Sequence, residues 1–177
     1  VTNMPLRDSN IQLWTALKLG ALNQTGTSVV AGADDWLFTA EEFETPKGPS
    51  FVAKLTDASE RLALHGVQLL PVIIPDKARI YADKLPHARG SNLEQRYAKL
   101  QILLDKSDHK PINLQEALST LRSQHDSFLR SDTHWSPRGA EASAKAIAAS
   151  LPAIGDTSFE TRFGASQPYD GDLLTFL

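Results

Sequence analysis

The sequence contains no cysteine among its 177 residues, so it can form neither a disulfide nor a thiolate metal site. No apolar run approaches the ~20 residues that a membrane-spanning helix needs. The net charge is −3, which excludes the broad positive surface of a protein that binds nucleic acid or anionic membranes. The lack of cysteine does not fix the compartment. The remaining composition, 41% hydrophobic and 22% charged, is typical of one globular domain, and we take residues 1–177 as that domain.

Helical and strand patterns alternate along the chain. Apolar residues at helical spacing are followed by short apolar runs, and the run at 67–74 is nearly continuous, as in a strand buried on both faces of a parallel sheet. Pro71 is a misfit within that run and predicts a bulge or an edge position. The pattern indicates an α/β protein, a doubly wound α/β/α sandwich. The expected helices lie near 10–19, 51–62, 92–104, 114–121 and 137–151, and the expected strands at 28–31, 36–39, 67–74, 111–114 and 128–129.

The most informative stretch is residues 132–140, which read Asp-Thr-His-Trp-Ser-Pro-Arg-Gly-Ala. In an extended segment Asp132 and His134 would point to the same side, so the carboxylate could reach one ring nitrogen and leave the other free to accept a proton. This is the base-and-orienter half of a hydrolase or acyltransferase triad. No serine or cysteine lies in a recognisable nucleophile motif. Ser136 is better interpreted as a helix N-cap, because Pro137 follows at the first helical position.

Each of these residues also has a structural interpretation. An Asp-x-His before a helix can simply satisfy the hydrogen bonds of its own loop. The same pair could ligate zinc, but no third ligand lies at a useful spacing, so we predict no metal site and no cofactor. Trp135 could pack under the loop or stack on a sugar ring.

Two further segments have candidate roles. Lys77 follows the apolar run 67–74, where sites gather in doubly wound sheets, and could hold a substrate oxygen or be solvated. Asp76 before it is predicted to cap a helix. The Asp-Gly-Asp at 170–172 is interpreted as a turn, with calcium binding as a weaker alternative.

The stretch 132–140 resembles the signature of the alginate O-acetyltransferase family, the AlgJ-like and AlgX-like proteins. Residues 29–38 and 75–81 resemble two other blocks of that family, in the same order. The resemblance implies an SGNH-hydrolase-like fold with a permuted catalytic order, in which Asp and His precede the serine. Asp132 and His134 match the family's catalytic Asp and His. Lys77 and Trp135 are candidate substrate-binding residues from the residue-level arguments above, not from the resemblance.

The catalytic serine has no counterpart in these 177 residues, so the resemblance predicts an incomplete domain that is inactive alone. It also predicts a trimmed chain whose export signal or anchor has been removed.

The function implied is O-acetylation of an exported polysaccharide, alginate or another exopolysaccharide, by a Ser-His-Asp mechanism. The resemblance places the protein in the periplasm, possibly membrane-anchored in its full-length form, with a membrane-bound acyltransferase as the source of acetyl groups. Two other functions fit the residues. One is a carbohydrate acetylesterase with the same triad, and the other is a non-catalytic module for carbohydrate binding or complex assembly.

Overall fold

The computed structural model describes residues 28–45, 51–107, 109–151, 155, 157 and 160–177. Its regular elements alternate between helices and short strands, as the sequence pattern predicts. In chain order they are β1 (Val29–Ala31), β2 (Leu37–Thr39), the 3-10 helix η1 (Ala40–Phe43), α2 (Val52–Ala63), β3 (Val72–Ile73), α3 (Lys77–Ile80), the 3-10 helix η2 (Ala82–Lys84), α4 (Ser91–Lys106), β4 (Ile112–Asn113), α5 (Gln115–Arg122), α6 (Pro137–Ala149) and the 3-10 helix η3 (Asp172–Phe176).

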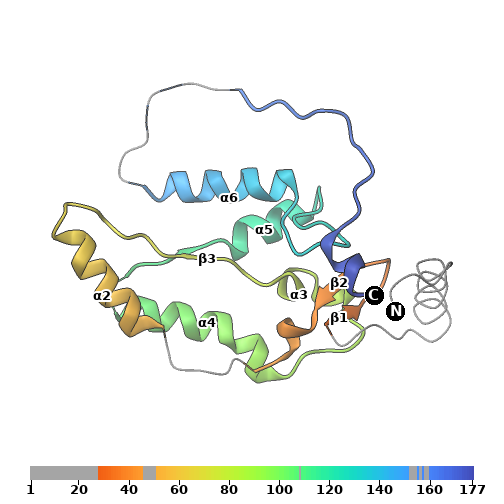
Figure 1. Ribbon diagram of the computed structural model, residues 1–177, viewed down its shortest axis with the longest axis horizontal. Helices are drawn as coiled ribbons and strands as arrows, with labels where there is room; N and C mark the ends of the chain where they lie inside the picture. Colours follow the sequence, from red (N-terminus) through yellow and green to blue (C-terminus); the bar gives the residue numbers. More distant parts are fainter. Residues whose placement is uncertain (1–27, 46–50, 108, 152–154, 156, 158–159) are drawn as a thin grey trace, which may run out of the picture.

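A parallel strand pair lies between two layers of helices. Strands β3 and β4 are parallel, with Val72 opposite Ile112 and Ile73 opposite Asn113. Helices α5 and α6 lie on one side of this pair, and α2 and α4 lie on the other (Figure 1). The predicted α/β layering is therefore present. No helix in the described part of the chain is both long enough and apolar enough to cross a membrane.

The strands are shorter than the sequence predicts. Only Val72 and Ile73 of the run 67–74 form a strand, and Val67 and Ile74 are about half exposed. Pro71 lies just before the strand, where it needs no ladder N–H, and its carbonyl accepts a hydrogen bond from the amide of Ile112. The predicted strand at 128–129 is a single bridge, and the predicted helix at 10–19 lies outside the described residues.

A hairpin at the start of the described chain supplies the centre of the core. Strands β1 and β2 pair antiparallel through a turn in which Asp34 and Asp35 both take positive φ, as tight hairpin turns require. The turn is followed by Trp36, which is buried and stacks on Tyr81 with ring centroids 3.8 Å apart. The main core forms around this pair, from the residues Phe38, Ala78, Ile80, Ile112, Leu114, Leu118 and Phe128.

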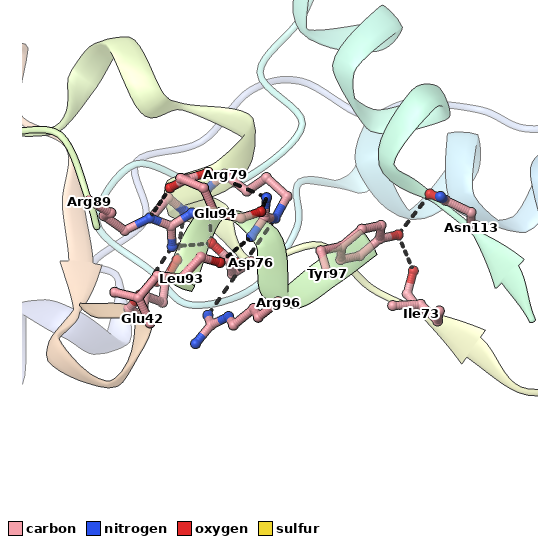
Figure 2. A network of polar contacts seen from close by, with 11 residues as sticks. Glu42, Ile73, Asp76, Arg79, Arg89, Leu93, Glu94, Arg96, Tyr97 and Asn113 are labelled. Atoms are coloured by element: carbon pink, nitrogen blue, oxygen red, sulfur yellow. Dashed lines mark hydrogen bonds and ion pairs between the residues drawn. The ribbon is translucent and has the colours of Figure 1, made fainter. Parts of the chain in front are cut away.

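Asp76 is the N-cap of α3 and joins this short helix to α4. Its carboxylate accepts the main-chain N–H of Arg79, so the predicted cap is confirmed. Figure 2 shows three guanidinium groups around the same carboxylate, those of Arg79, Arg89 and Arg96, at 2.5–3.4 Å. Burial raises the pKa of Asp76, but the arginines outweigh that effect and the pKa is lowered. The network therefore fixes the segment that leads from β3 to Lys77.

Candidate active site

The segment 127–136 is a closed loop that ends at the first turn of α6. The amide of Ser136 donates to the carbonyl of Ser127 at 2.9 Å, and the amide of Leu129 donates to the carbonyl of His134 at 3.1 Å. These bonds fold the chain back on itself, so that Asp132 and His134 lie at the tip. We call residues 131–134 the dyad loop.

Ser136 is the N-cap of α6, as predicted. Its Oγ accepts the amide of Gly139 at 3.0 Å and donates to the carbonyl of Asp126 at 2.6 Å. The side chain is buried and both of its hydrogen-bonding roles are satisfied inside the protein. Ser136 is therefore a structural cap, and no serine hydroxyl of the described residues is hydrogen-bonded to His134.

Asp132 and His134 form the predicted pair. Oδ1 of Asp132 lies 2.7 Å from Nδ1 of His134, within hydrogen-bond reach, and it also accepts the amide of His134 at 2.8 Å. The sequence-based reason for this contact was wrong in one respect. The dyad loop is a turn rather than an extended strand, and the carboxylate bonds the amide two residues later, as Asp does in turns. The catalytic role of the pair remains a prediction.

The two partners sit in different environments. Asp132 is fully buried, which raises its pKa, but hydrogen bonds from the Asp172 amide, from His134 and from the Tyr169 hydroxyl outweigh burial and lower the pKa to about 2. The carboxylate is therefore an anion at neutral pH. The imidazole of His134 is 74% exposed, and its Nε2 has no hydrogen bond to any residue that the structure describes. A buried anion on Nδ1 and an open Nε2 are what a general base requires.

Lys77 holds the dyad loop in place through main-chain carbonyl groups. Its ammonium donates to the main-chain carbonyls of Leu37 (2.7 Å), Arg130 (2.8 Å) and Asp132 (3.0 Å). An ammonium has three donors, so all of them are used within the protein. Lys77 is only 3% exposed, and burial lowers its pKa to about 8, partly offset by Glu42 and other carboxylates. This geometry does not favour the predicted contact with a substrate oxygen, because Lys77 has no free donor, and we assign it a positioning role instead.

Trp135 packs against the core, which is the first of the two roles predicted for it. It pairs with Phe128 in an isolated bridge and contacts the core cluster around Trp36 and Tyr81. The ring is partly exposed, so sugar stacking stays a prediction.

Asp172 is a neighbour of the pair that the sequence analysis missed. It is the first residue of η3, 40 positions after Asp132, and its main-chain amide donates to Oδ2 of Asp132 at 2.9 Å. Its own Oδ2 lies 3.7 Å from Nδ1 of His134. The only signal in the sequence was the Asp-Gly-Asp at 170–172, which was interpreted as a turn.

Asp172 is also a third possible metal ligand beside Asp132 and His134, which the sequence did not reveal. Ligand atoms of Asp132, His134 and Asp172 lie within 4.8 Å of one another. Four N–H or O–H donors already occupy the two oxygens of Asp132, however: two from His134, one from Tyr169 and one from Asp172. A cation would have to displace these bonds, so the geometry favours an orienting carboxylate over a metal ligand.

A cavity of about 590 Å³ borders the dyad loop on its Thr133 side. Its wall is mostly apolar and is formed by β3, α4 and the segment before α3. Its lining residues are Thr39, Glu42, Phe51, Ile73, Ile74, Pro75, Asp76, Lys77, Arg96, Tyr97, Leu100, Phe128 and Thr133. The cavity reaches the dyad loop at Thr133, and neither Asp132 nor His134 is among its lining residues.

Comparison with known proteins assigns the chain to a family. The model of the SGNH hydrolase-like domain of the acetyltransferase AlgX matches residues 29–177. The chain belongs to this family. Its fold is therefore SGNH-hydrolase-like, as the resemblance implied.

Relatives in the family are named for alginate O-acetylation. The probable alginate O-acetylases AlgJ of Pseudomonas putida and Pseudomonas aeruginosa are 32% and 33% identical to the chain, over 98% of its residues. The chain spans about half the length of these relatives, 48% and 47%.

Solved structures agree with the assignment. The O-acetyltransferase domain of Pseudomonas putida AlgJ matches with a TM-score of 0.74 and 32% identity, covering 87% of this chain and 59% of that one. AlgX of Pseudomonas aeruginosa matches with a TM-score of 0.52 and 23% identity, covering 72% of this chain and 32% of that one, and supports the fold alone.

Proposed function

We propose that this domain carries the proton-transfer half of an O-acetyltransferase that modifies an exported polysaccharide, alginate or another exopolysaccharide. The observation that carries the proposal is the 2.7 Å hydrogen bond between Oδ1 of Asp132 and Nδ1 of His134. The imidazole of His134 is 74% exposed, so its other nitrogen is accessible. The membership of the chain in the alginate O-acetylation family supports acyl transfer over other uses of an Asp-His pair.

The chemistry runs in two balanced steps. A serine, which the family pattern places later in a longer chain, attacks the acetyl carbonyl of the donor ester, and Nε2 of His134 takes its hydroxyl proton. The donor alcohol leaves with that proton, and an acetyl-serine remains. A sugar hydroxyl then attacks the acetyl-serine and gives its proton to Nε2, and the serine recovers a proton as the acetylated sugar departs. Asp132 stabilises the imidazolium in both steps.

Water could replace the sugar in the second step, which would make the protein an esterase. The triad serves both reactions, so the acceptor decides between them. An assay with an acetyl donor, an oligosaccharide and water distinguishes the two, because a transferase forms acetylated oligosaccharide faster than free acetate.

The location and the partner are part of the same proposal. We propose that the protein acts in the periplasm and receives acetyl groups through a membrane-bound acyltransferase. The support is the family resemblance. Cell fractionation tests the location, and co-purification with a membrane acyltransferase tests the partner.

The test of the proposed function is His134→Ala in the longest gene product that contains this domain. Acetyl transfer to the oligosaccharide should be lost, while the melting temperature stays close to that of the wild type, because the side chain is exposed. His125→Ala is the matched control, since it removes another exposed imidazole of the same chain. Near-normal transfer by His134→Ala would leave the non-catalytic assembly module as the function.

A further inference from the structure

The turn 171–173 also holds the dyad loop, through contacts separate from those of Lys77. The carboxylate of Asp172 accepts the amide of Thr133 at 2.8 Å and its hydroxyl at 2.5 Å, while the amide of Leu173 donates to the carbonyl of Ser131 at 3.1 Å. Together with the bond from the Asp172 amide to Asp132, this makes four hydrogen bonds between two segments 40 residues apart in sequence.

This contact is fitted closely. A Cβ on Gly171 would lie 2.0 Å from the carbonyl oxygen of Ser131, so only glycine allows the approach. Leu173 is 1% exposed and packs with Val29 and Leu37 of the hairpin, which places η3 beside β2 (Figure 1). The main chain at Asp172 is therefore held in place by the core, and its short side chain reaches Thr133 from there.

The hydrogen-bond directions around Nδ1 of His134 follow from this arrangement. Thr133 Oγ1 lies 3.3 Å from Nδ1 and has a single proton, which it donates to Asp172. Toward Nδ1 it can therefore act only as an acceptor. Asp132 Oδ1 at 2.7 Å and Asp172 Oδ2 at 3.7 Å are also acceptors. Every polar group described around Nδ1 thus favours a proton on that nitrogen, which leaves the lone pair on Nε2.

We propose that Asp172 is a positioning residue of the acyl-transfer site, which supports Asp132 in fixing the tautomer of His134 by keeping the proton of the Thr133 hydroxyl away from Nδ1. This inference rests on the proposed function. Without the Asp172 carboxylate, the Thr133 hydroxyl is free to rotate and donate to Nδ1, which stabilises the tautomer whose proton is on Nε2. That tautomer cannot accept a proton from the nucleophile.

The decisive experiment compares Asp172→Ala with Asp170→Ala in the longest gene product that contains this domain. Asp170 is exposed and lies two residues before Asp172, so its variant removes the same charge. We expect Asp172→Ala to lower kcat by about tenfold or more with KM nearly unchanged, since a histidine in the wrong tautomer costs orders of magnitude in turnover. Adding Thr133→Val should restore most of the lost kcat, because the competing donor is gone.

A spectroscopic measurement separates this role from a merely structural one. The ¹⁵N resonances of the His134 ring report which nitrogen carries the proton. They should show Nδ1 protonated in the wild type, a mixture in Asp172→Ala, and Nδ1 protonated again in the double variant. If Asp172→Ala melts far below the wild type, Asp172→Asn takes its place with the same expectation for kcat, because its amide places a donor near Nδ1.

Two outcomes would overturn the inference. One is an Asp172→Ala kcat equal to that of Asp170→Ala. The other is a lower kcat with Nδ1 still fully protonated and no recovery in the double variant. The His134→Ala variant keeps this inference apart from the proposed function: if it retains transfer, the proposed function fails, whereas if it is inactive and Asp172→Ala is normal, only the role of Asp172 is wrong.

Discussion

The ammonium of Lys77 donates to the main-chain carbonyl of Asp132 at 3.0 Å. The side-chain carboxylate of Asp132 lies 2.7 Å from Nδ1 of His134, within hydrogen-bond distance. Asp132 is thus fixed through its backbone by a cation and presents its side chain to the imidazole. The ammonium of Lys77 also lies 5.1 Å from the ring centroid of Trp36 and 5.5 Å from that of Phe38, and aromatic faces attract a cation. The pair therefore rests on a buried, charged support.

Lys77→Met should destabilise the protein. The substitution keeps the length of the side chain but leaves three carbonyl groups without their donor, each at a cost of about 1–3 kcal/mol, partly offset because no charge is buried. We expect a net loss of about 2–4 kcal/mol in the free energy of unfolding, measured by urea denaturation at pH 7. Lys99→Met, on the exposed face of α4, should change it by less than about 0.5 kcal/mol. Equal stability of the two variants would show that the three bonds contribute nothing.

The same lysine predicts a pH dependence with a definite sign. Its pKa is lowered from 10.5 to about 8 in the folded protein, so the unfolded chain binds more protons between these values. The stability of the wild type relative to Lys77→Met should therefore rise as the pH increases from 8 to 10.5, by at most about 3 kcal/mol. Denaturation curves of both proteins across this range check it. A relative stability that falls with pH would contradict the burial of a cation at this position.

Asp132 predicts a pH dependence of the same sign in the acid range. Its pKa is lowered to about 2, so its stabilising effect is present above the ordinary value of 3.8 and is lost as the pH falls toward 2. The stability difference between the wild type and Asp132→Asn should shrink by about 2 kcal/mol over this interval. Acid titrations followed by circular dichroism measure it. A constant difference would mean that the carboxylate gains nothing from its four hydrogen bonds.

Gly139 predicts a steric effect behind the dyad loop. A Cβ at this position would lie 2.1 Å from the carbonyl oxygen of Ser127, so Gly139→Ala must displace α6 from the loop. We expect a loss of about 1–3 kcal/mol in thermal or urea unfolding. Gly155→Ala is the control, since nothing lies within 4 Å of its Cβ position, and it should be neutral. A neutral Gly139→Ala would show that α6 and the loop are not closely packed.

The sequence predicted the local features that depend on few residues. The hairpin at 28–39, the cap by Ser136, the cap by Asp76 and the Asp132–His134 contact are all set within about ten residues of chain, and all are present. The strand at 67–74 was overestimated, because a continuous apolar run does not show which of its residues find a partner, and only Val72 and Ile73 pair with β4.

Long-range contacts could not be predicted in the same way. Lys77 was expected to face a substrate because it follows a strand, yet folding brings three carbonyls from two other segments to its ammonium. Asp172 was not assigned a role, because its contact with the dyad loop spans 40 residues and depends on the packing of Leu173 against the hairpin. A single sequence carries no local signal for either arrangement.

The 177-residue chain by itself should show no saturable hydrolysis of p-nitrophenyl acetate above the level of its own His134→Ala variant. The pair is present, but no serine hydroxyl of the described residues is hydrogen-bonded to His134, so no acetyl-serine can form through it. Steady-state rates over a range of substrate concentrations check this. Saturable turnover would show that a nucleophile lies within the chain.

The central claim is that His134 acts as the proton acceptor in acetyl transfer, and chemical rescue tests it most directly. In the longest gene product that contains this domain, His134→Ala leaves an open space beside the Asp132 carboxylate, because the imidazole is 74% exposed. Added imidazole should restore a measurable, saturable part of the acetyl transfer to an oligosaccharide, and it should not accelerate the wild type or His125→Ala. Near-wild-type transfer by His134→Ala without any imidazole would contradict the claim.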